Sequence, residues 1–109
     1  MDFGNKIRRM AEKKQWEKLR GCFDGCEEER RTAAEVCGSS ADREAYDIIV
    51  SQINSCADQK RKAQLIDALG ETRRIEAAIY LSWLDSVTPD GPVKTAIQGA
   101  KQSIRNRLR

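Results

Sequence analysis

The sequence predicts an all-α protein, and three observations lead to that prediction. Apolar residues recur at the three- and four-residue spacing of amphipathic helices along nearly all of the 109 residues. Gly, Asp and Pro lie where such helices would begin or end. No segment shows the apolar–polar alternation of a half-buried strand, and the β-branched run Ile48-Ile49-Val50 lies inside a helical pattern.

Four helices are predicted in the N-terminal half. The first, over residues 4–13, carries Ile7 and Met10 and would cap the chain as part of residues 1–14. The next three are expected over residues 15–24 with Trp16, Leu19 and Phe23, over 27–37 with Ala33, Ala34, Val36 and Cys37, and over 42–54 with Tyr46, Ile49, Val50 and Ile53. The helix over 27–37 is expected to begin at the acidic run 27–29, because negative charge is favourable at a helix N-terminus.

Three more helices are predicted in the C-terminal half. Their apolar residues are Ala63, Leu65, Ile66, Ala68 and Leu69 in 58–70, Ile75, Ala78, Ile79 and Leu84 in 72–87, and Val93, Ala96, Ile97, Ala100 and Ile104 in the last helix. Gly70 would end the first of these, and Asp90-Gly91-Pro92 predicts the start of the last, with Asp90 as its cap. The total is six or seven helices with short connections, which favours antiparallel neighbours.

The amino-acid composition limits the possible functions as well as the possible folds. The chain has 20 Lys and Arg, 17 Asp and Glu and no His, with a net charge of +3. Without His, it lacks the usual general base near pH 7 and the commonest metal ligand. No apolar run approaches the ~18–20 residues of a membrane helix, and the N-terminus lacks the apolar segment of a signal peptide. We therefore expect a single cytoplasmic domain over residues 1–109 that does not associate with a membrane.

A 32-residue period underlies the helical pattern. Gly38 and Gly70 are 32 residues apart, and each closes a predicted helix. The residues that recur at this step include the apolar set Ala33, Leu65 and Ile97, the basic set Arg30, Lys62 and Lys94, and the acidic pair Asp58 and Asp90. A period of this length is typical of helical-repeat proteins, in which each helix pair buries apolar surface against the next.

The same positions resemble the HEAT-like repeat family, whose second helix often reads Asp-x-x-Val-Arg-x-x-Ala-x-x-Ala-Leu-Gly. The chain shows Asp90-Gly-Pro-Val93-Lys94-x-Ala96-Ile97-x-x-Ala100, and it shows Asp58-x-x-Arg61-Lys62 followed by Ala68-Leu69-Gly70. The resemblance implies a short right-handed α-α superhelix of about three helix pairs, over residues 15–38, 41–70 and 72–107. A compact helical bundle is the alternative that the same periodicity allows.

The candidates for chemistry are four cysteines: Cys22, Cys26, Cys37 and Cys56. On a continuous helix Cys22 and Cys26 would share a face, but this is the only closely spaced pair, which argues against a zinc site. A cysteine nucleophile would need an adjacent base, usually His. We therefore interpret the thiols as reduced core or bystander residues, with a redox-active pair as the alternative. We expect no catalytic residue, no metal and no cofactor.

Two sets of residues are candidates for binding. Tyr80 and Trp83 either pack inside the protein or grip a partner, since Trp and Tyr are enriched at binding hot spots. The HEAT-like resemblance implies that exposed residues of the second helices line an inner surface, here Arg31, Lys62, Lys94 and Gln98. It also implies that the basic set pairs with Asp58 and Asp90, whereas the alternative is that this set follows a phosphate backbone.

By resemblance, the expected function is a non-enzymatic scaffold or adaptor that binds a protein or peptide. Self-association is a further expectation, because so short an array has exposed end faces. Two alternatives stay open. One is a nucleic-acid-binding protein that uses the basic set, and the other is a lyase-type or cofactor-handling protein, because HEAT-like relatives include bilin-attachment lyases. Fold alone does not choose among them.

Overall fold

A computed structural model describes residues 3–40, 42–72 and 74–107. These residues form seven α-helices and one 3₁₀ helix and contain no strand, so the predicted all-α fold is confirmed. The helices are α1 (Phe3–Glu12), α2 (Trp16–Gly21), η1 (Cys22–Asp24), α3 (Glu27–Ser39), α4 (Arg43–Ser55), α5 (Gln59–Leu69), α6 (Ile75–Val87) and α7 (Pro92–Arg107). The predicted boundaries at residues 1 and 41 lie outside the described residues.

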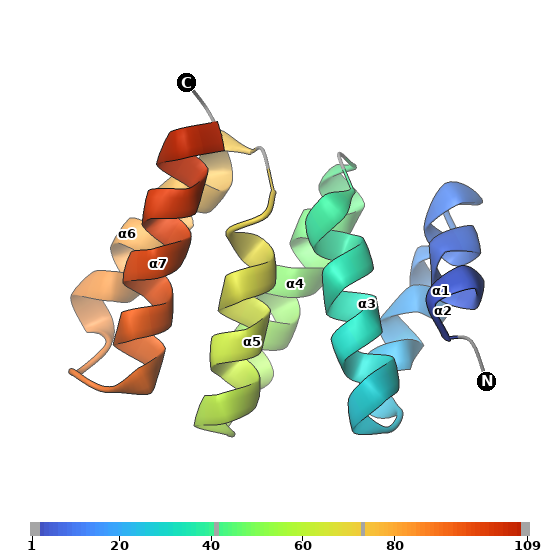
Figure 1. Cartoon of the computed structure of the whole chain (residues 1–109), viewed down its shortest axis with the longest axis horizontal. Coiled ribbons are helices and arrows are strands. Elements are labelled where there is room, and N and C mark those ends of the chain that lie inside the picture. Colours follow the sequence, from blue (N-terminus) through green and yellow to red (C-terminus); the bar gives the residue numbers. More distant parts are fainter. Residues whose placement is uncertain (1–2, 41, 73, 108–109) are drawn as a thin grey trace.

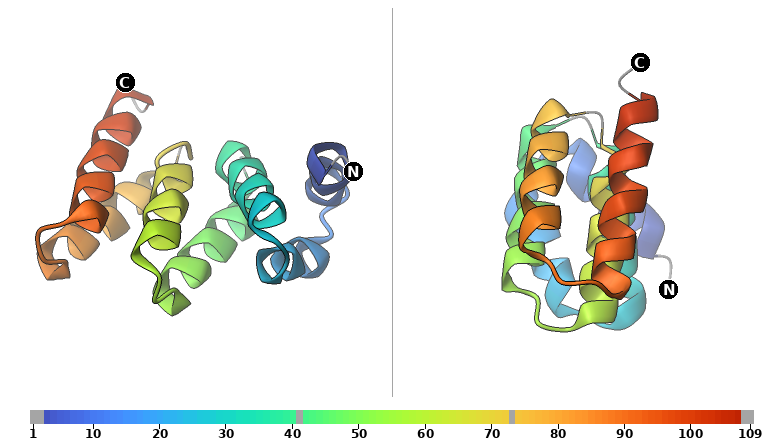
Figure 2. Two further views of the ribbon diagram at one scale, coloured as in Figure 1. Left: turned by 60° about the horizontal axis from the view of Figure 1, so that its bottom comes forward. Right: turned by 90° about the vertical axis from the view of Figure 1, so that its left-hand side faces the viewer.

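The helices lie in two layers (Figure 1). Helices α1, α3, α5 and α7 form the front layer of that view, where α3 packs on both α1 and α5, and α5 packs on α7. Helices α2, α4 and α6 form the layer behind, and the end-on view of Figure 2 shows the two layers side by side. Because α4 packs on α3 and α5 while α6 packs on α7, the apolar core lies between the layers.

The 32-residue period of the sequence recurs in the structure. Helices α3 and α5 begin 32 residues apart, at Glu27 and Gln59, and α4 and α6 do the same, at Arg43 and Ile75. The apolar sets at this step are buried throughout: Ala33, Leu65 and Ile97, and Val36, Ala68 and Ala100. Successive helix pairs therefore use the same positions to face the core.

Two glycines allow the front-layer helices to approach one another. A Cβ on Gly38 would lie 2.6 Å from the carbonyl oxygen of Ala68, and one on Gly70 would lie 3.0 Å from Cα of Ala100. Gly70 does follow the last residue of α5, but its φ of −64° is that of an ordinary right-handed residue. Helix α3 continues one residue past Gly38, to Ser39. The glycines are therefore needed for close helix contact. The predicted helix end at Gly70 is confirmed, whereas the one at Gly38 is wrong by one residue.

Local signals in the sequence predict the starts of α3 and α5 correctly and fail at two other places. Asp58 caps α5, because its Oδ1 accepts a hydrogen bond from the Arg61 backbone N–H at 3.2 Å. Pro92 is the first residue of α7, but the residue before it is Gly91, with φ of 151°, so Asp90 is not the cap. Cys22 and Cys26 do not share one helix, because η1 ends at Asp24 and Cys26 directly precedes α3.

None of the helices in the described ranges is both long enough and apolar enough to cross a membrane.

Candidate functional site

Helix α6 carries a line of exposed apolar side chains. Ile75, Ile79, Trp83 and Val87 are 64, 68, 56 and 56% exposed, and they are the large hydrophobic side chains that stand out to solvent in the described ranges. They are spaced four residues apart, so they follow one side of the helix from its first residue to its last. We call these four residues the α6 ridge.

The sequence predicts the buried face of this helix wrongly. Of the four residues that predict the apolar side of this helix, Ile75, Ala78, Ile79 and Leu84, only Leu84 is buried, and Ile75 and Ile79 are the most exposed residues of the ridge. The buried residues of α6 are Ala77, Leu81 and Leu84. Since α6 is apolar on nearly every side, periodicity does not choose its inner face, and packing against α7 does.

The equivalent helix of the preceding pair is polar at the same four positions. Counting back 32 residues from the ridge gives Arg43, Asp47, Ser51 and Ser55 on α4, all of them exposed. The inward positions are conserved in character, since Ala45 and Ile49 of α4 match Ala77 and Leu81 of α6 and all four are fully buried. Polar residues at these four positions are therefore compatible with the fold, so packing within the chain does not explain why α6 has apolar residues there.

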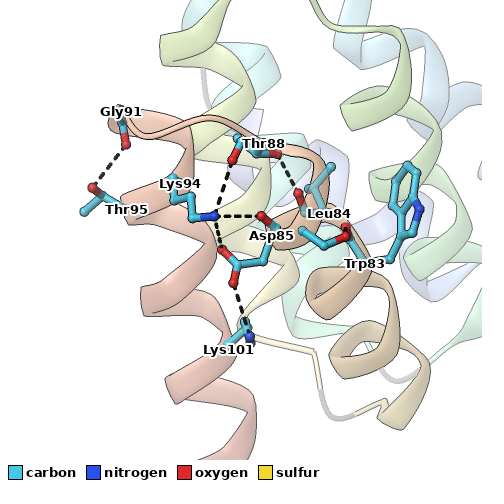
Figure 3. A network of polar contacts seen from close by, with 9 residues as sticks. Trp83, Leu84, Asp85, Thr88, Gly91, Lys94, Thr95 and Lys101 are labelled. Atoms are coloured by element: carbon cyan, nitrogen blue, oxygen red, sulfur yellow. Dashed lines mark hydrogen bonds and ion pairs between the residues drawn. The ribbon is translucent and has the colours of Figure 1, made fainter.

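The charged side chains of α6 are paired. Glu76 forms ion pairs with Arg74 at 3.1 Å and Arg43 at 3.7 Å. Its pKa is lowered, first by a hydrogen bond from its own backbone N–H and then by a hydrogen bond from Arg74. Asp85 lies between Lys94 at 3.4 Å and Lys101 at 3.5 Å of α7 (Figure 3). The outer side of α6 therefore presents apolar groups with no unpaired charge among them.

Tyr80 and Trp83 have different environments. The Tyr80 hydroxyl donates a hydrogen bond to Oδ1 of Asn54 at 2.7 Å and so joins α6 to α4. Burial, with a smaller contribution from Tyr46, raises the pKa of Tyr80 to about 12. The rings of Tyr80 and Trp83 are 6.0 Å apart, so the half-buried tyrosine supports the exposed indole. Trp83 is thus an exposed residue of the ridge, and Tyr80 lies beside it.

Two of the three residues in the predicted basic set, Arg30 and Lys94, donate hydrogen bonds to backbone oxygens that precede their own helices. Lys94 donates hydrogen bonds to the backbone oxygens of Asp85 at 2.8 Å and Thr88 at 3.4 Å, just before its own helix (Figure 3). Arg30 does the same at the preceding loop, where it donates to the Gly25 oxygen at 2.9 Å. The carboxylate beside Lys94 is Asp85 of the same helix pair, so the expected pairing with Asp58 or Asp90 is wrong. The loop carbonyls were missed because no side-chain pattern encodes them.

The remaining predicted site residues lie elsewhere. Lys62 lines a hollow of about 480 Å³ together with Trp83 and Val87 of the ridge. Arg31 is exposed and lines a groove between α3 and α5, whereas Gln98 is exposed on α7. The six residues predicted from the sequence therefore do not form one site. The two of them that the structure brings close to the ridge are Lys62 and Tyr80.

The cysteines divide into buried and accessible thiols. Cys37 is fully buried, and desolvation raises its pKa to about 12. Burial also raises the pKa of Cys22, whose Sγ lies 3.7 Å from Sδ of Met10. Cys26 is exposed and Cys56 is half-buried, so the core interpretation holds for two of the four thiols. In the part of the chain that the structure describes, no three Cys, Asp or Glu side chains gather in a way that could hold a metal ion.

Comparison with known proteins finds no match for this chain among family models, curated proteins or solved structures.

Proposed function

We propose that this protein is a non-enzymatic scaffold or adaptor module of HEAT-like type, which binds a partner protein through the α6 ridge. The observation that carries the proposal is the exchange of four exposed polar residues on α4 for four exposed apolar residues at the equivalent positions of α6. The 32-residue recurrence of helix starts supports the HEAT-like assignment. The free thiols support a reducing, cytoplasmic setting.

An apolar ridge of this kind favours a protein partner over a small polar ligand. Contiguous exposed apolar surface is typical of protein–protein interaction sites, and Trp is among the commonest hot-spot residues. Burying the exposed part of each ridge side chain would contribute roughly 1 kcal/mol or more. The mechanism is shape and charge complementarity, without a chemical step.

The partner that suits the ridge is an amphipathic helix. The ridge spans residues 75–87, or about 18 Å at ~1.5 Å per residue, which matches roughly three turns of a partner helix. Helices α4 and α6 together carry one basic side chain and four acidic ones: Arg43, Glu44, Asp47, Glu76 and Asp85. Asp47, Glu76 and Asp85 already form ion pairs within the chain, so the apolar face of the partner, more than its charge, would match the ridge.

The test is affinity capture with the full chain from nuclease-treated lysate, at low and at moderate salt. The variant for comparison replaces the four ridge residues of α6 by the residues at the equivalent positions of α4: Ile75→Arg, Ile79→Asp, Trp83→Ser and Val87→Ser. We expect the native protein to retain a stoichiometric protein partner at both salt concentrations, and the variant to retain at least tenfold less. Circular dichroism should show the same helix content in both, because the four positions are exposed.

A matched control introduces the same two charges on another helix, as Thr95→Asp and Gln102→Arg at exposed positions of α7. This control should capture the partner as the native protein does. Equal capture by the α6 variant would contradict the proposal. Recovery of nucleic acid alone, lost on nuclease treatment, would favour the nucleic-acid alternative. A native protein that forms only a dimer through the ridge would show that its partner is a second copy.

A further inference from the structure

A second surface, in the opposite layer, has the properties of a ligand site. A groove of about 720 Å³ lies between α3 and α5, within the size range of known ligand pockets. Its floor contains the small residues Ala34, Gly38 and Ala68. The two helices nearly touch at Gly38 and Ala68, so the groove suits a single extended chain better than a third helix of ~10 Å diameter.

One end of the groove is positively charged. Near the N-terminal ends of α3 and α5, Arg30 donates to the Gly25 oxygen at 2.9 Å and Arg61 donates to the Phe23 oxygen at 2.5 Å. Carbonyl oxygens fix these guanidinium groups but do not neutralise them. Arg31 beside them is exposed. None of the three arginines forms an ion pair with a carboxylate of the described residues, so the lining of the groove is positively charged at this end, although acidic residues outside the lining lie at the start of both helices.

The other end is acidic. Towards the C-terminal ends of the same helices the groove is lined by Glu35, Asp67 and Glu71. Glu71 forms an ion pair with Arg107, whereas Glu35 and Asp67 have no ion-pair partner within the described ranges. Burial and the nearby Glu71 raise the pKa of Asp67, as expected for a carboxylate that lacks a counter-charge.

We propose that the α3–α5 groove binds an extended peptide segment that carries an acidic side chain and, two or three residues away, a basic one. The acidic side chain would lie at the arginines and the basic one at Glu35 and Asp67. Arg31 and Glu35 are four residues apart on α3, and Arg61 and Asp67 are six apart on α5, or about 6 and 9 Å along the helices. An extended chain covers that distance in two or three residues at ~3.3 Å each.

The charge arrangement also argues against a nucleic acid in this groove. A phosphate backbone carries negative charge along its whole length and would meet Glu35 and Asp67 after it passed the arginines. The proposal does not use the α6 ridge, so each of the two can fail without the other. If both hold, the protein has two separate binding surfaces, as an adaptor requires.

The test measures fluorescence anisotropy of labelled synthetic peptides with the full chain. The first two probes carry Glu-Val-Thr-Lys and the reverse order Lys-Val-Thr-Glu between Gly-Ser flanks, and the third carries Gln at both charged positions. We expect one charged probe to bind at least tenfold more tightly than the neutral one and to be preferred over the reverse order. Equal binding of the three probes, or no binding of any of them, would overturn the proposal.

A charge-swapped variant makes the test specific to the groove. Arg31→Glu combined with Asp67→Lys leaves the net charge unchanged and exchanges two exposed side chains at opposite ends. We expect this variant to invert the preference between the two charged probes. An unchanged preference would place binding elsewhere and refute the assignment. A single-stranded RNA that binds more tightly and displaces the peptide would refute it as well.

A final control separates this site from the proposed function. The α6 variant with the α4 residues should bind the peptides as the native protein does, because its substitutions lie in the other layer (Figure 2). Loss of peptide binding in that variant would show that the ridge, and not the groove, holds the probe.

Discussion

Helices α4 and α6 occupy equivalent places in successive helix pairs, yet their outer sides differ in chemistry. Both have 13 residues, and both bury an Ala and a larger aliphatic residue at the same two positions. Outside, α4 presents Arg, Asp and Ser where α6 presents Ile, Trp and Val. Packing in the core constrains the inner positions, whereas the outer positions can differ. This difference is the basis for the proposal that α6 binds a partner.

The strongest test of this comparison truncates an inner and an outer residue of the same helix. Leu81→Ala removes a fully buried side chain of α6, and Ile49→Ala removes its counterpart on α4. Each should lower the free energy of unfolding by about 2–5 kcal/mol, because a cavity is left. Ile79→Ala, at a position 68% exposed, should change it by less than about 0.5 kcal/mol.

Urea denaturation followed by circular dichroism measures all three variants. A large loss of stability for Ile79→Ala would mean that the ridge packs within the chain, which would remove the main support for a binding role.

A smaller effect is expected where the two helices are joined by a hydrogen bond. Tyr80→Phe keeps the ring beside Trp83 and removes the bond to Asn54. We expect a loss of about 0.5–1.5 kcal/mol in the free energy of unfolding, at the low end because Asn54 is exposed and can bond to water. The emission of Trp83 should change with it if Tyr80 positions the indole, while Tyr46→Phe provides the control.

The same tyrosine predicts a pH dependence on the alkaline side. Its pKa is raised to about 12 in the folded protein from an ordinary value of 10.0, so the folded state retains the phenolic proton over a pH range in which the unfolded chain loses it. Stability should therefore fall as pH rises from about 10 towards 12. Ultraviolet titration of phenolate absorbance should show this late ionisation in the native protein, and Tyr80→Phe should remove the part due to Tyr80 and leave that of Tyr46, whose pKa burial also raises.

The smallest effect concerns the ion pairs of Glu76 with Arg43 and Arg74. Because the pKa of Glu76 is lowered, its contribution is present above the ordinary glutamate pKa and is lost as pH falls through the folded value. Surface ion pairs contribute little, so Glu76→Gln should shift a denaturation curve only slightly at pH 7. The shift should vanish in acid. A shift that persists in acid would mean that Glu76 acts through something other than its charge.

Much of the fold could be predicted because helix formation depends on short-range patterns. Every predicted helix has a counterpart, with ends that differ by three residues or fewer, and the 32-residue period recurs in the helix starts. The exception is the segment over 15–24, which divides into α2 and η1. In the candidate site, Trp83 and Tyr80 could be predicted from the sequence because they are three residues apart on one helix. The ridge to which Trp83 belongs could not be predicted.

The sequence by itself determined the helices, their period and the absence of a usual catalytic base, because these follow from residue types and spacing along one chain. Tertiary structure alone decided which side of α6 faces inward, which carboxylate meets Lys94 and how α3 and α5 shape a groove. Each of these depends on residues from different helices that meet only after packing. An apolar residue is compatible with a helix on any of its sides. Whether that residue belongs to the core or to the exposed surface depends on whether another helix packs against it.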